Sequence, residues 1–394
     1  MTRFCCCLTG IVVVTALLCM AFPAYAEPLE AECPLKLTAP AAVLMEAETG
    51  AVIFEKNGDQ KRPAASVTKL MTLLITLEKL EQGEISLKDP VSVSKNAAGQ
   101  TGSEAFLDAY AVYPLEDLLR STVIASANDS AVALAEYIAG SEERFAVLMN
   151  EKAEALGLVN TRYVNCTGLP AEGQYTSAMD VARISAAVCR YPLYFQYSSI
   201  WMDTLTHPSG RKTELTNTNR LVRFYQDCDG LKTGSTQEAK YCLTATAERN
   251  GMRLIAVVLG VPNSQTRFDE ARAMLDYGFS GYRRITVAQK GDLIGERVKV
   301  RMGAREEAEA ALGEGLSMLL KNGQEKALSY VAELPEYLDA PMKKGEEIGK
   351  IRVLLDGRAV AVLPAVTAQD IRLPGWLEGF ARIFENWHES APVK

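Results

Sequence analysis

The spacing of hydrophobic positions predicts an α/β unit in which strands flank a helical block and share one sheet. Residues 42–54 alternate apolar and polar side chains around a turn, as a β-hairpin would. From Ser66 to Gly83 leucines recur at helical spacing, which predicts a helix that begins at that serine. Two apolar runs flank Asn250-Gly251, a dipeptide typical of tight hairpin turns. Further helical patterns cover residues 115–124, 130–139, 142–156 and 178–189.

The pattern changes after about residue 284, where short apolar runs are separated by Gly, Asp and Lys. Such runs predict a small all-β domain of about 90 residues. They cover residues 297–301, 327–332, 348–355 and 360–366. Residues 304–312 carry helical propensity inside this region, and the pattern leaves their secondary structure open.

The first 26 residues have the three-part layout of a cleavable secretory signal. Arg3 precedes an apolar stretch over residues 8–22, and Ala24-Tyr25-Ala26 offers a small-residue cleavage site after Ala26. The alternative is a retained membrane helix, but a span needs about 20 apolar residues and this run is shorter. The sequence therefore predicts an exported protein.

The last segment of the chain predicts an amphipathic helix over residues 374–389. Its apolar face consists of Trp376, Leu377, Phe380, Ile383, Phe384 and Trp387. Several large aromatics on a terminal helix favour contact with a membrane surface, because they are costly to leave in water. The alternative is a tail packed on the β domain, since the acidic opposite face does not favour anionic lipid.

Composition narrows the possible chemistry. Hydrophobic residues make up 48% and charged residues 23% of the chain, which excludes a mainly disordered protein. The net charge of −7 argues against nucleic acid as a partner. The two histidines, His207 and His388, cannot form a multi-histidine metal site and leave little for a Ser-His-Asp triad. Acid–base chemistry must rest on Lys, Ser, Tyr or carboxylates, and no metal or cofactor is predicted.

Five of the nine cysteines lie beyond the predicted signal. An exported chain could form two disulfides from them and keep one thiol, yet their spacings show no disulfide framework and no Cys-x-x-Cys. Buried free thiols are the favoured interpretation. The five are Cys33, Cys166, Cys189, Cys228 and Cys242.

Ser66 and Lys69 open the first long helix and lie on one face of it, because they are three residues apart. A serine hydroxyl is a poor nucleophile until a base removes its proton, and a lysine with a lowered pKa can be that base. The start of a helix adds a positive dipole end and free N–H groups beside the hydroxyl. The geometry therefore suits a Ser–Lys nucleophile.

Alone, this pair is a weak signal, and its weight comes from combination with two other short motifs. Only Ser66/Lys69, Ser126/Asn128 and residues 232–234 give Ser-x-x-Lys at a helix start, then Ser-x-Asn between helices, then Lys-Thr-Gly on a strand. The other copies of the first two motifs lie in polar stretches and are interpreted as ordinary surface sequence. They are Ser92/Lys95, Ser209/Lys212 and Ser94/Asn96.

With these motifs in this order, the chain resembles the low-molecular-weight penicillin-binding proteins that are D-alanyl-D-alanine carboxypeptidases, relatives of the serine β-lactamases. The resemblance implies an α/β fold with an antiparallel sheet flanked by helices and a helical subdomain, followed by the small all-β domain and the terminal amphipathic helix. The implied division is a signal peptide 1–26, a catalytic domain 27–283, a β domain 284–373 and a membrane-surface helix 374–394. Further matching stretches are residues 63–72, 126–129, 165–169 and 229–234.

The resemblance also implies a role for each residue of the first two motifs. Ser66 is the acyl-forming nucleophile, and Lys69 is its general base. Ser126 relays a proton toward the departing amine, and Asn128 hydrogen-bonds the peptide amide of the substrate.

The third motif and one arginine complete the implied site. Lys232 and Thr233 bind the terminal carboxylate of the substrate, and Lys232 also keeps Lys69 near neutral. Gly234 leaves the strand edge bare, so that the substrate can lie along it as an added strand. The backbone N–H groups of Ser66 and Ser235 form an oxyanion hole, and Arg267 is a further carboxylate-binding residue.

The implied activity is a serine D,D-carboxypeptidase at the extracytoplasmic face of the cytoplasmic membrane, which removes the terminal D-alanine from peptidoglycan pentapeptide stems. β-Lactams would acylate the same serine. A β-lactamase is disfavoured, because no Glu-x-x-Leu-Asn lies between Ser126 and Lys232. A non-catalytic penicillin- or muropeptide-binding protein is disfavoured by the intact motifs. Endopeptidase action on cross-links uses the same residues and stays open.

Overall fold

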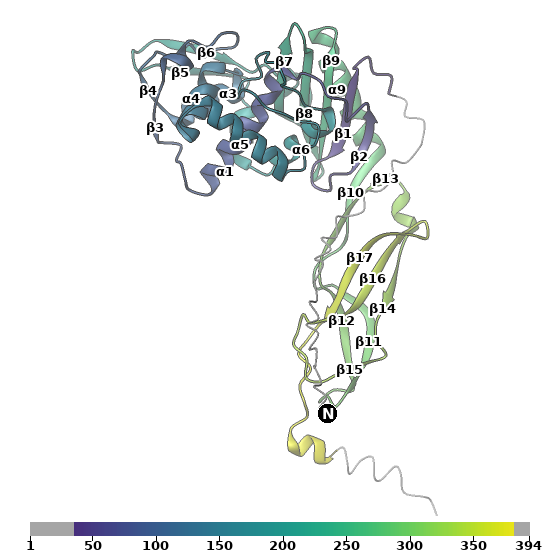
Figure 1. The fold of residues 1–394 in the computed structure, drawn as a ribbon. Helices are drawn as coiled ribbons and strands as arrows, with labels where there is room; N and C mark the ends of the chain where they lie inside the picture. Colours follow the sequence, from purple (N-terminus) through teal and green to yellow (C-terminus); the bar gives the residue numbers. More distant parts are fainter. Residues whose placement is uncertain (1–34, 382–394) are drawn as a thin grey trace, which may run out of the picture.

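The computed structural model describes residues 35–381. Its catalytic unit is built on a five-stranded antiparallel sheet in the order β2-β1-β9-β8-β7 (Figure 1). The strands come from both ends of this unit, which confirms the predicted shared sheet. They are β1 (Ala41–Glu46), β2 (Val52–Lys56), β7 (Cys228–Thr236), β8 (Lys240–Arg249) and β9 (Met252–Val261).

Helices cover both faces of this sheet, and the alternation of side chains along β9 divides the core in two. Ile255, Val257 and Leu259 are buried with residues of α1 (Lys69–Glu81) and α6 (Ala178–Val188). The intervening side chains of β9 face the other way and pack with α9 (Ser264–Gly281). Because both faces are buried, residues 254–259 of this strand form a continuous apolar run.

A helical subdomain lies beside the sheet and supplies the middle of the chain (Figure 1). The helices predicted over residues 115–124, 130–139 and 142–156 are present within one or two residues of their expected bounds, whereas the helix predicted to begin at Ser66 becomes α-helical only at Lys69. They and the short elements around them are α2 (Lys95–Ala98), α3 (Leu115–Ile124), α4 (Asn128–Ala139), α5 (Glu142–Ala155), α7 (Pro192–Ser198), α8 (Leu221–Phe224), the hairpin β3 (Pro90–Ser92) with β4 (Val112–Pro114), and the hairpin β5 (Met202–Thr206) with β6 (Lys212–Thr216).

The C-terminal region is an elongated all-β domain that extends away from the catalytic unit (Figure 1). β10 (Tyr282–Ala288) pairs with β13 (Leu316–Lys321), and a six-stranded sheet follows in the order β14-β16-β17-β12-β11-β15. Its strands are β11 (Leu293–Arg301), β12 (Glu307–Leu312), β14 (Leu328–Glu333), β15 (Tyr337–Asp339), β16 (Glu347–Leu355) and β17 (Arg358–Thr367), with the 3-10 turn η2 (Gln324–Ala327) before β14.

The segment with helical propensity, residues 304–312, contains the strand β12. Ala308 and Ala310 alternate into the core of the β domain, while β11 and β17 pair with the two sides of the strand. Tertiary pairing therefore overrides the local preference of this alanine-rich stretch.

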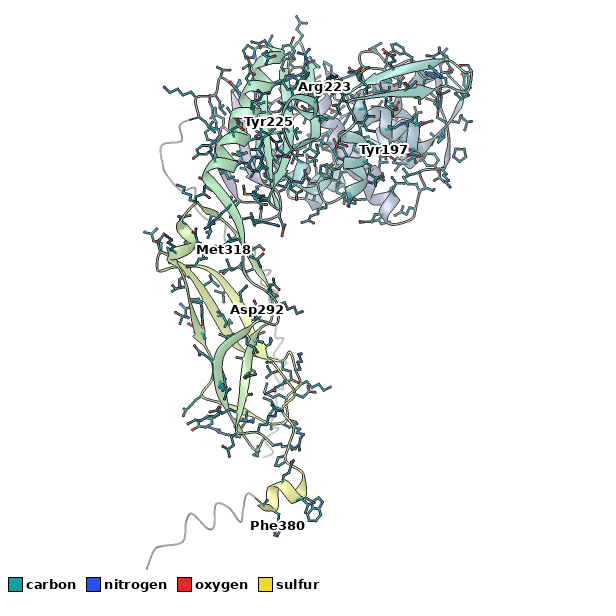
Figure 2. The ribbon with its side chains drawn as sticks, turned by 180° about the vertical axis from the view of Figure 1, so that it is seen from behind. Tyr197, Arg223, Tyr225, Asp292, Met318 and Phe380 are labelled. Atoms are coloured by element: carbon teal, nitrogen blue, oxygen red, sulfur yellow. The ribbon has the colours of Figure 1, made fainter. Side chains whose placement is uncertain are left out.

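The end of the described chain is helical over residues 376–381, at the tip of the β domain remote from the catalytic unit. Figure 2 shows Phe380 on this segment. Trp376 is 79% exposed and Phe380 is 60% exposed. The rest of the predicted amphipathic helix and the predicted signal peptide lie outside the described residues. Within residues 35–381, no helix is long and apolar enough to cross a membrane.

The cysteines and the histidine of the described chain have structural roles. All four cysteines between residues 35 and 381 carry free thiols, and Cys166, Cys228 and Cys242 are buried, as interpreted from their spacing. His207 is buried between the hydroxyl groups of Tyr113 and Thr213, at 2.8 Å from each. Its ring is fully occupied, which argues against a catalytic role.

Candidate active site

Ser66 lies in the 3-10 turn η1 (Ala65–Thr68), which leads directly into α1. Ala65 has a φ of +49°, a left-handed conformation that non-glycine residues rarely adopt. The loop after α5 holds this turn in place, because Gly168 approaches so closely that a Cβ there would be 1.9 Å from the Ala65 carbonyl oxygen. The hydroxyl is therefore presented by a strained turn that is fixed from outside.

Lys69 is fully buried, and its ammonium group is surrounded by three acceptors. Nζ is 3.1 Å from Ser66 Oγ, 2.5 Å from Asn128 Oδ1 and 2.8 Å from the Thr167 carbonyl oxygen. Burial lowers the pKa of Lys69 to about 7, against the opposing influence of the acidic groups of Cys166 and Asp129. The amine is thus neutral in part of the molecules at physiological pH and lies beside the serine.

Ser126 and Asn128 lie at the turn between α3 and α4, where Ser126 has a φ of +63°. Lys232 Nζ donates to Ser126 Oγ at 2.6 Å. Asn128 accepts from Lys69 and donates through Nδ2 to the Thr101 carbonyl oxygen at 2.6 Å, so both ends of its amide are engaged within the protein. The second motif therefore connects both lysines of the site.

Asp129, directly after this motif, holds the loop over residues 101–107 in place. Its carboxylate accepts the backbone N–H groups of Ala105 and Leu107, each at 3.0 Å. The backbone N–H of Asn128 donates to the Ser103 carbonyl oxygen at 2.7 Å. The loop over residues 101–107 is thus tied to the start of α4 and forms one side of the site.

Lys232, Thr233 and Gly234 occupy β7, the outermost strand of the sheet. Burial lowers the pKa of Lys232, and repulsion from the cationic groups of Lys69 and Arg267 lowers it further. A Cβ at Gly234 would be 2.5 Å from the Ala64 carbonyl oxygen and 2.9 Å from the Ser66 backbone nitrogen. Only glycine lets this strand approach Ser66 so closely.

Arg267 belongs to α9, and its side chain extends to Gly234 of β7. It is 9% exposed, and its Nη1 donates to the Gly234 carbonyl oxygen at 3.3 Å. Its Nε is buried and has no hydrogen-bond partner among the described residues. Burial lowers the pKa of Arg267 to about 10, which leaves it cationic at neutral pH. A buried guanidinium with a free N–H is suited to binding an anion.

The structure thus brings the predicted residues of all three motifs and Arg267 together. Three partners in the site were not recognised from the sequence: the Thr167 carbonyl, the Asp129 carboxylate and Thr218, whose hydroxyl accepts from Thr233 Oγ1 at 2.7 Å. Thr167 and Asp129 lie within stretches that were recognised as similar to the family, but the sequence did not indicate what either residue does in the site.

The additional motif copies lie elsewhere, as expected. Ser94 caps α2, and Asn96 contacts Glu136. Ser209 hydrogen-bonds Asp108. No cluster of metal-ligating side chains occurs in residues 35–381.

Comparisons with known proteins point in one direction. A family model described as D-alanyl-D-alanine carboxypeptidase matches residues 28–263, and the model of the penicillin-binding protein 5 C-terminal domain matches residues 282–372. The D-alanyl-D-alanine carboxypeptidase DacF of Bacillus subtilis is 37% identical over 350 residues, which are 89% of this chain and 90% of the relative. DacC of Escherichia coli, of the same name, is 34% identical over 395 residues, covering 98% and 96%. The crystal structure of penicillin-binding protein 5 from Haemophilus influenzae matches with a TM-score of 0.77 and 32% identity, covering 87% of this chain and 100% of that one.

Proposed function

Because the chain belongs to the D-alanyl-D-alanine carboxypeptidase family and acts in peptidoglycan metabolism, we propose that Ser66 is its nucleophile and Lys69 the general base. The observation that carries this proposal is the contact of 3.1 Å between a buried lysine with a pKa of about 7 and the serine hydroxyl. As Ser66 Oγ bonds to the substrate carbonyl carbon, its proton passes to the neutral Nζ of Lys69.

The next step is departure of D-alanine, for which Ser126 and Lys232 are placed to deliver a proton. Lys232 Nζ donates to Ser126 Oγ at 2.6 Å, which forms a chain toward the leaving nitrogen. The C–N bond breaks, the amine takes the proton, and D-alanine leaves while the acyl group stays on Ser66. Water then hydrolyses the ester. Asn128 turns from its internal partners toward the peptide amide of the substrate in this scheme.

The substrate lies along the outer edge of β7 as an added strand. The absence of a side chain at Gly234 supports this placement, because the strand there passes directly beside the Ser66 backbone nitrogen. The N–H groups of Ser66 and Ser235 form the oxyanion hole.

The terminal carboxylate of the substrate meets three groups at the end of this strand: Lys232, Thr233 and Arg267. Burial and two nearby cations lower the pKa of Lys232 in the free protein, and the substrate carboxylate opposes this shift, because an adjacent anion favours the protonated amine. The unpartnered Nε of Arg267 gives the same anion a further donor.

The experiment that tests this function follows free D-alanine released from a diacyl-Lys-D-Ala-D-Ala tripeptide by the purified protein. We expect release, and we expect penicillin to leave a long-lived adduct on the peptide that contains Ser66, located by mass spectrometry. An adduct on another residue would overturn the assignment of the nucleophile. An adduct on Ser66 without release would instead indicate a protein that binds and does not turn over.

The rate of acylation should depend on pH through Lys69. A base acts only when deprotonated, and the lowered pKa of about 7 sets the midpoint at which this form is lost on acidification. Below that pH the second-order rate constant of penicillin acylation should fall about tenfold per pH unit. Stopped-flow acylation between pH 5 and 8 measures this limb, and a rate that is flat across that range would argue against a neutral Lys69.

We propose further that the protein is exported, with a signal peptide over residues 1–26, a catalytic domain 27–283, a β domain 284–373 and a membrane-surface helix 374–394. Location at the extracytoplasmic face of the cytoplasmic membrane agrees with a peptidoglycan substrate. The exposed Trp376 and Phe380 support contact with the lipid surface.

Replacing both Trp376 and Phe380 by serine should weaken binding to lipid vesicles. The wild-type protein should sediment with vesicles of phosphatidylethanolamine and phosphatidylglycerol, and the double variant should partition about tenfold less. Tyr110→Ser is the control, because Tyr110 is a 74% exposed aromatic on the catalytic unit. Equal sedimentation of all three proteins would contradict the assignment.

A further inference from the structure

The backbone directly before Lys232 has its own set of hydrogen-bond partners outside the sheet. β7 is an edge strand, and its register with β8 is interrupted between Cys228 and Gly230. Regular ladder pairing is therefore lost around Asp229, and this segment needs other partners.

Three side chains donate to three consecutive carbonyl oxygens of this segment. Ser198 Oγ donates to Asp229 at 2.5 Å, Asn219 Nδ2 to Gly230 at 2.8 Å, and the Tyr194 hydroxyl to Leu231 at 3.1 Å. Tyr194 and Ser198 belong to α7, one turn apart, and Asn219 comes from the loop before α8. All three are buried. We call these three residues the carbonyl clamp.

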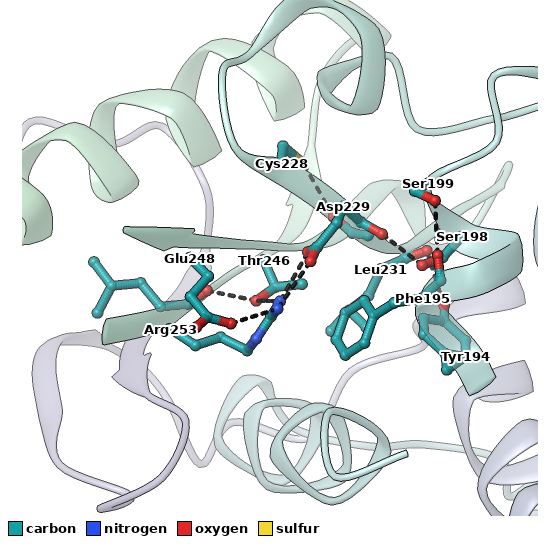
Figure 3. Close-up of polar contacts among 12 residues, drawn as sticks. Tyr194, Phe195, Ser198, Ser199, Cys228, Asp229, Leu231, Thr246, Glu248 and Arg253 are labelled. Atoms are coloured by element: carbon teal, nitrogen blue, oxygen red, sulfur yellow. Dashed lines mark hydrogen bonds and ion pairs between the residues drawn. The ribbon is translucent and has the colours of Figure 1, made fainter. Parts of the chain in front are cut away.

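The clamp is anchored on both sides, and Figure 3 shows the side on which Arg253 binds Asp229. Arg253 of β9 binds the Asp229 carboxylate through two hydrogen bonds of 2.8 Å, and its guanidinium stacks on the Phe195 ring of α7 at 4.1 Å. Asn217 Nδ2 donates to the carbonyl oxygens of Ser198 and Ile200, which ties the loop before α8 to the end of α7. Strand, helix and loop thus form one connected unit.

We propose that Tyr194, Ser198 and Asn219 are positioning residues for Lys232. The last carbonyl group that the clamp binds is that of Leu231. The next residue is Lys232, whose Nζ donates to Ser126 Oγ at 2.6 Å. The proposed substrate strand lies along the edge of β7 after Leu231. The clamp therefore holds residues 229–231 of this edge, and the residues that follow are left to bind the substrate. A displacement of about 1 Å at such a site costs about a hundredfold in rate, so the clamp controls carboxylate recognition without touching the substrate.

This inference rests on the proposed role of Lys232 and is tested by the double variant Tyr194→Phe/Ser198→Ala. The change removes two hydroxyl groups and keeps both side-chain frames. The control is Tyr197→Phe/Ser199→Ala, which makes the same chemical changes in and just after α7. There the tyrosine hydroxyl donates to Glu116 at 2.9 Å and the serine to the Phe195 carbonyl oxygen at 2.7 Å, and neither acceptor belongs to β7.

The measurement is kcat and KM for tripeptides ending in D-Ala-D-Ala with a free carboxylate or a C-terminal amide. In the clamp variant, KM for the carboxylate substrate should rise about tenfold or more, and the preference for carboxylate over amide should shrink by a similar factor. The control should stay within about twofold of wild type in both quantities. Thermal melting of each variant reports stability separately.

A clamp variant whose melting temperature falls while its carboxylate preference stays at the wild-type value would overturn the inference, because a merely structural contact behaves that way. If the double variant does not fold, Tyr194→Phe compared with Tyr197→Phe decides by the same readout. A wild-type protein that releases neither D-alanine from the carboxylate peptide nor D-alaninamide from the amide peptide would contradict the proposed residue roles rather than the clamp. Acylation by penicillin, which carries its own carboxylate, would then test the clamp alone.

Discussion

Replacing Ser66 by alanine is expected to abolish both D-alanine release and covalent labelling by penicillin. The change removes the only hydroxyl that hydrogen-bonds to the buried Lys69 amine among the described residues, at 3.1 Å, because the other two partners of this amine are the Asn128 side-chain oxygen and the Thr167 carbonyl oxygen. Loss of a serine nucleophile from a comparable catalytic unit costs about a millionfold in turnover, so activity should fall below detection. Release of D-alanine and gel fluorescence with a labelled penicillin measure the two effects.

The matched control is Ser92→Ala, which removes the serine of another Ser-x-x-Lys sequence. Ser92 lies on the short strand β3, in the helical subdomain, and should leave both activities within about twofold of wild type. Persistent labelling of the Ser66 variant would show that another serine accepts the acyl group. Ser126 would then be the first to test, because Lys232 contacts its hydroxyl.

Much of the fold could be predicted because the decisive signals are local. The helix over residues 115–124 has a strong apolar periodicity and is found with those bounds. The hairpin around Asn250 is equally well defined, since that residue adopts a φ of +51° and Gly251 one of +75°. Residues 304–312 could not be assigned from their local pattern, because β12 is held as a strand by pairing on both sides, with the preceding strand β11 and with β17, which lies far along the chain.

The sequence predicted which side chains form the site, but it did not predict which backbone groups hold those side chains in place. The functional groups of a Ser-x-x-Lys or Lys-Thr-Gly motif are side chains and can be identified from the residue types. The Thr167 carbonyl that accepts from Lys69 is a backbone group, which any residue type could supply. The pKa of Lys69 was expected to be lowered by burial together with a nearby cation, Lys232. Burial is the largest cause in the structure, while the repulsion between the two lysines lowers the pKa of Lys232.

The expectation for Gly168 follows from such a backbone contact. Gly168→Ala should lower the rate of penicillin acylation about a hundredfold, because it displaces the turn that presents Ser66, the proposed nucleophile. The added Cβ would be 1.9 Å from the Ala65 carbonyl oxygen and 2.9 Å from Thr68 Oγ1, so η1 must move. Any such movement changes the contact between Ser66 and Lys69, which the turn sets.

Gly173→Ala separates this effect from backbone strain. Gly173 has a φ of +81° against +82° at Gly168, but a Cβ there would meet nothing closer than 3.7 Å, from the Arg162 side chain. Both variants should lose about 1 to 2 kcal/mol in unfolding free energy through the left-handed conformation. Only Gly168→Ala should lose acylation, measured by stopped-flow beside thermal unfolding. Equal acylation rates in the two variants would mean that η1 tolerates displacement, and the position of Ser66 would then depend on α1 and β7 alone.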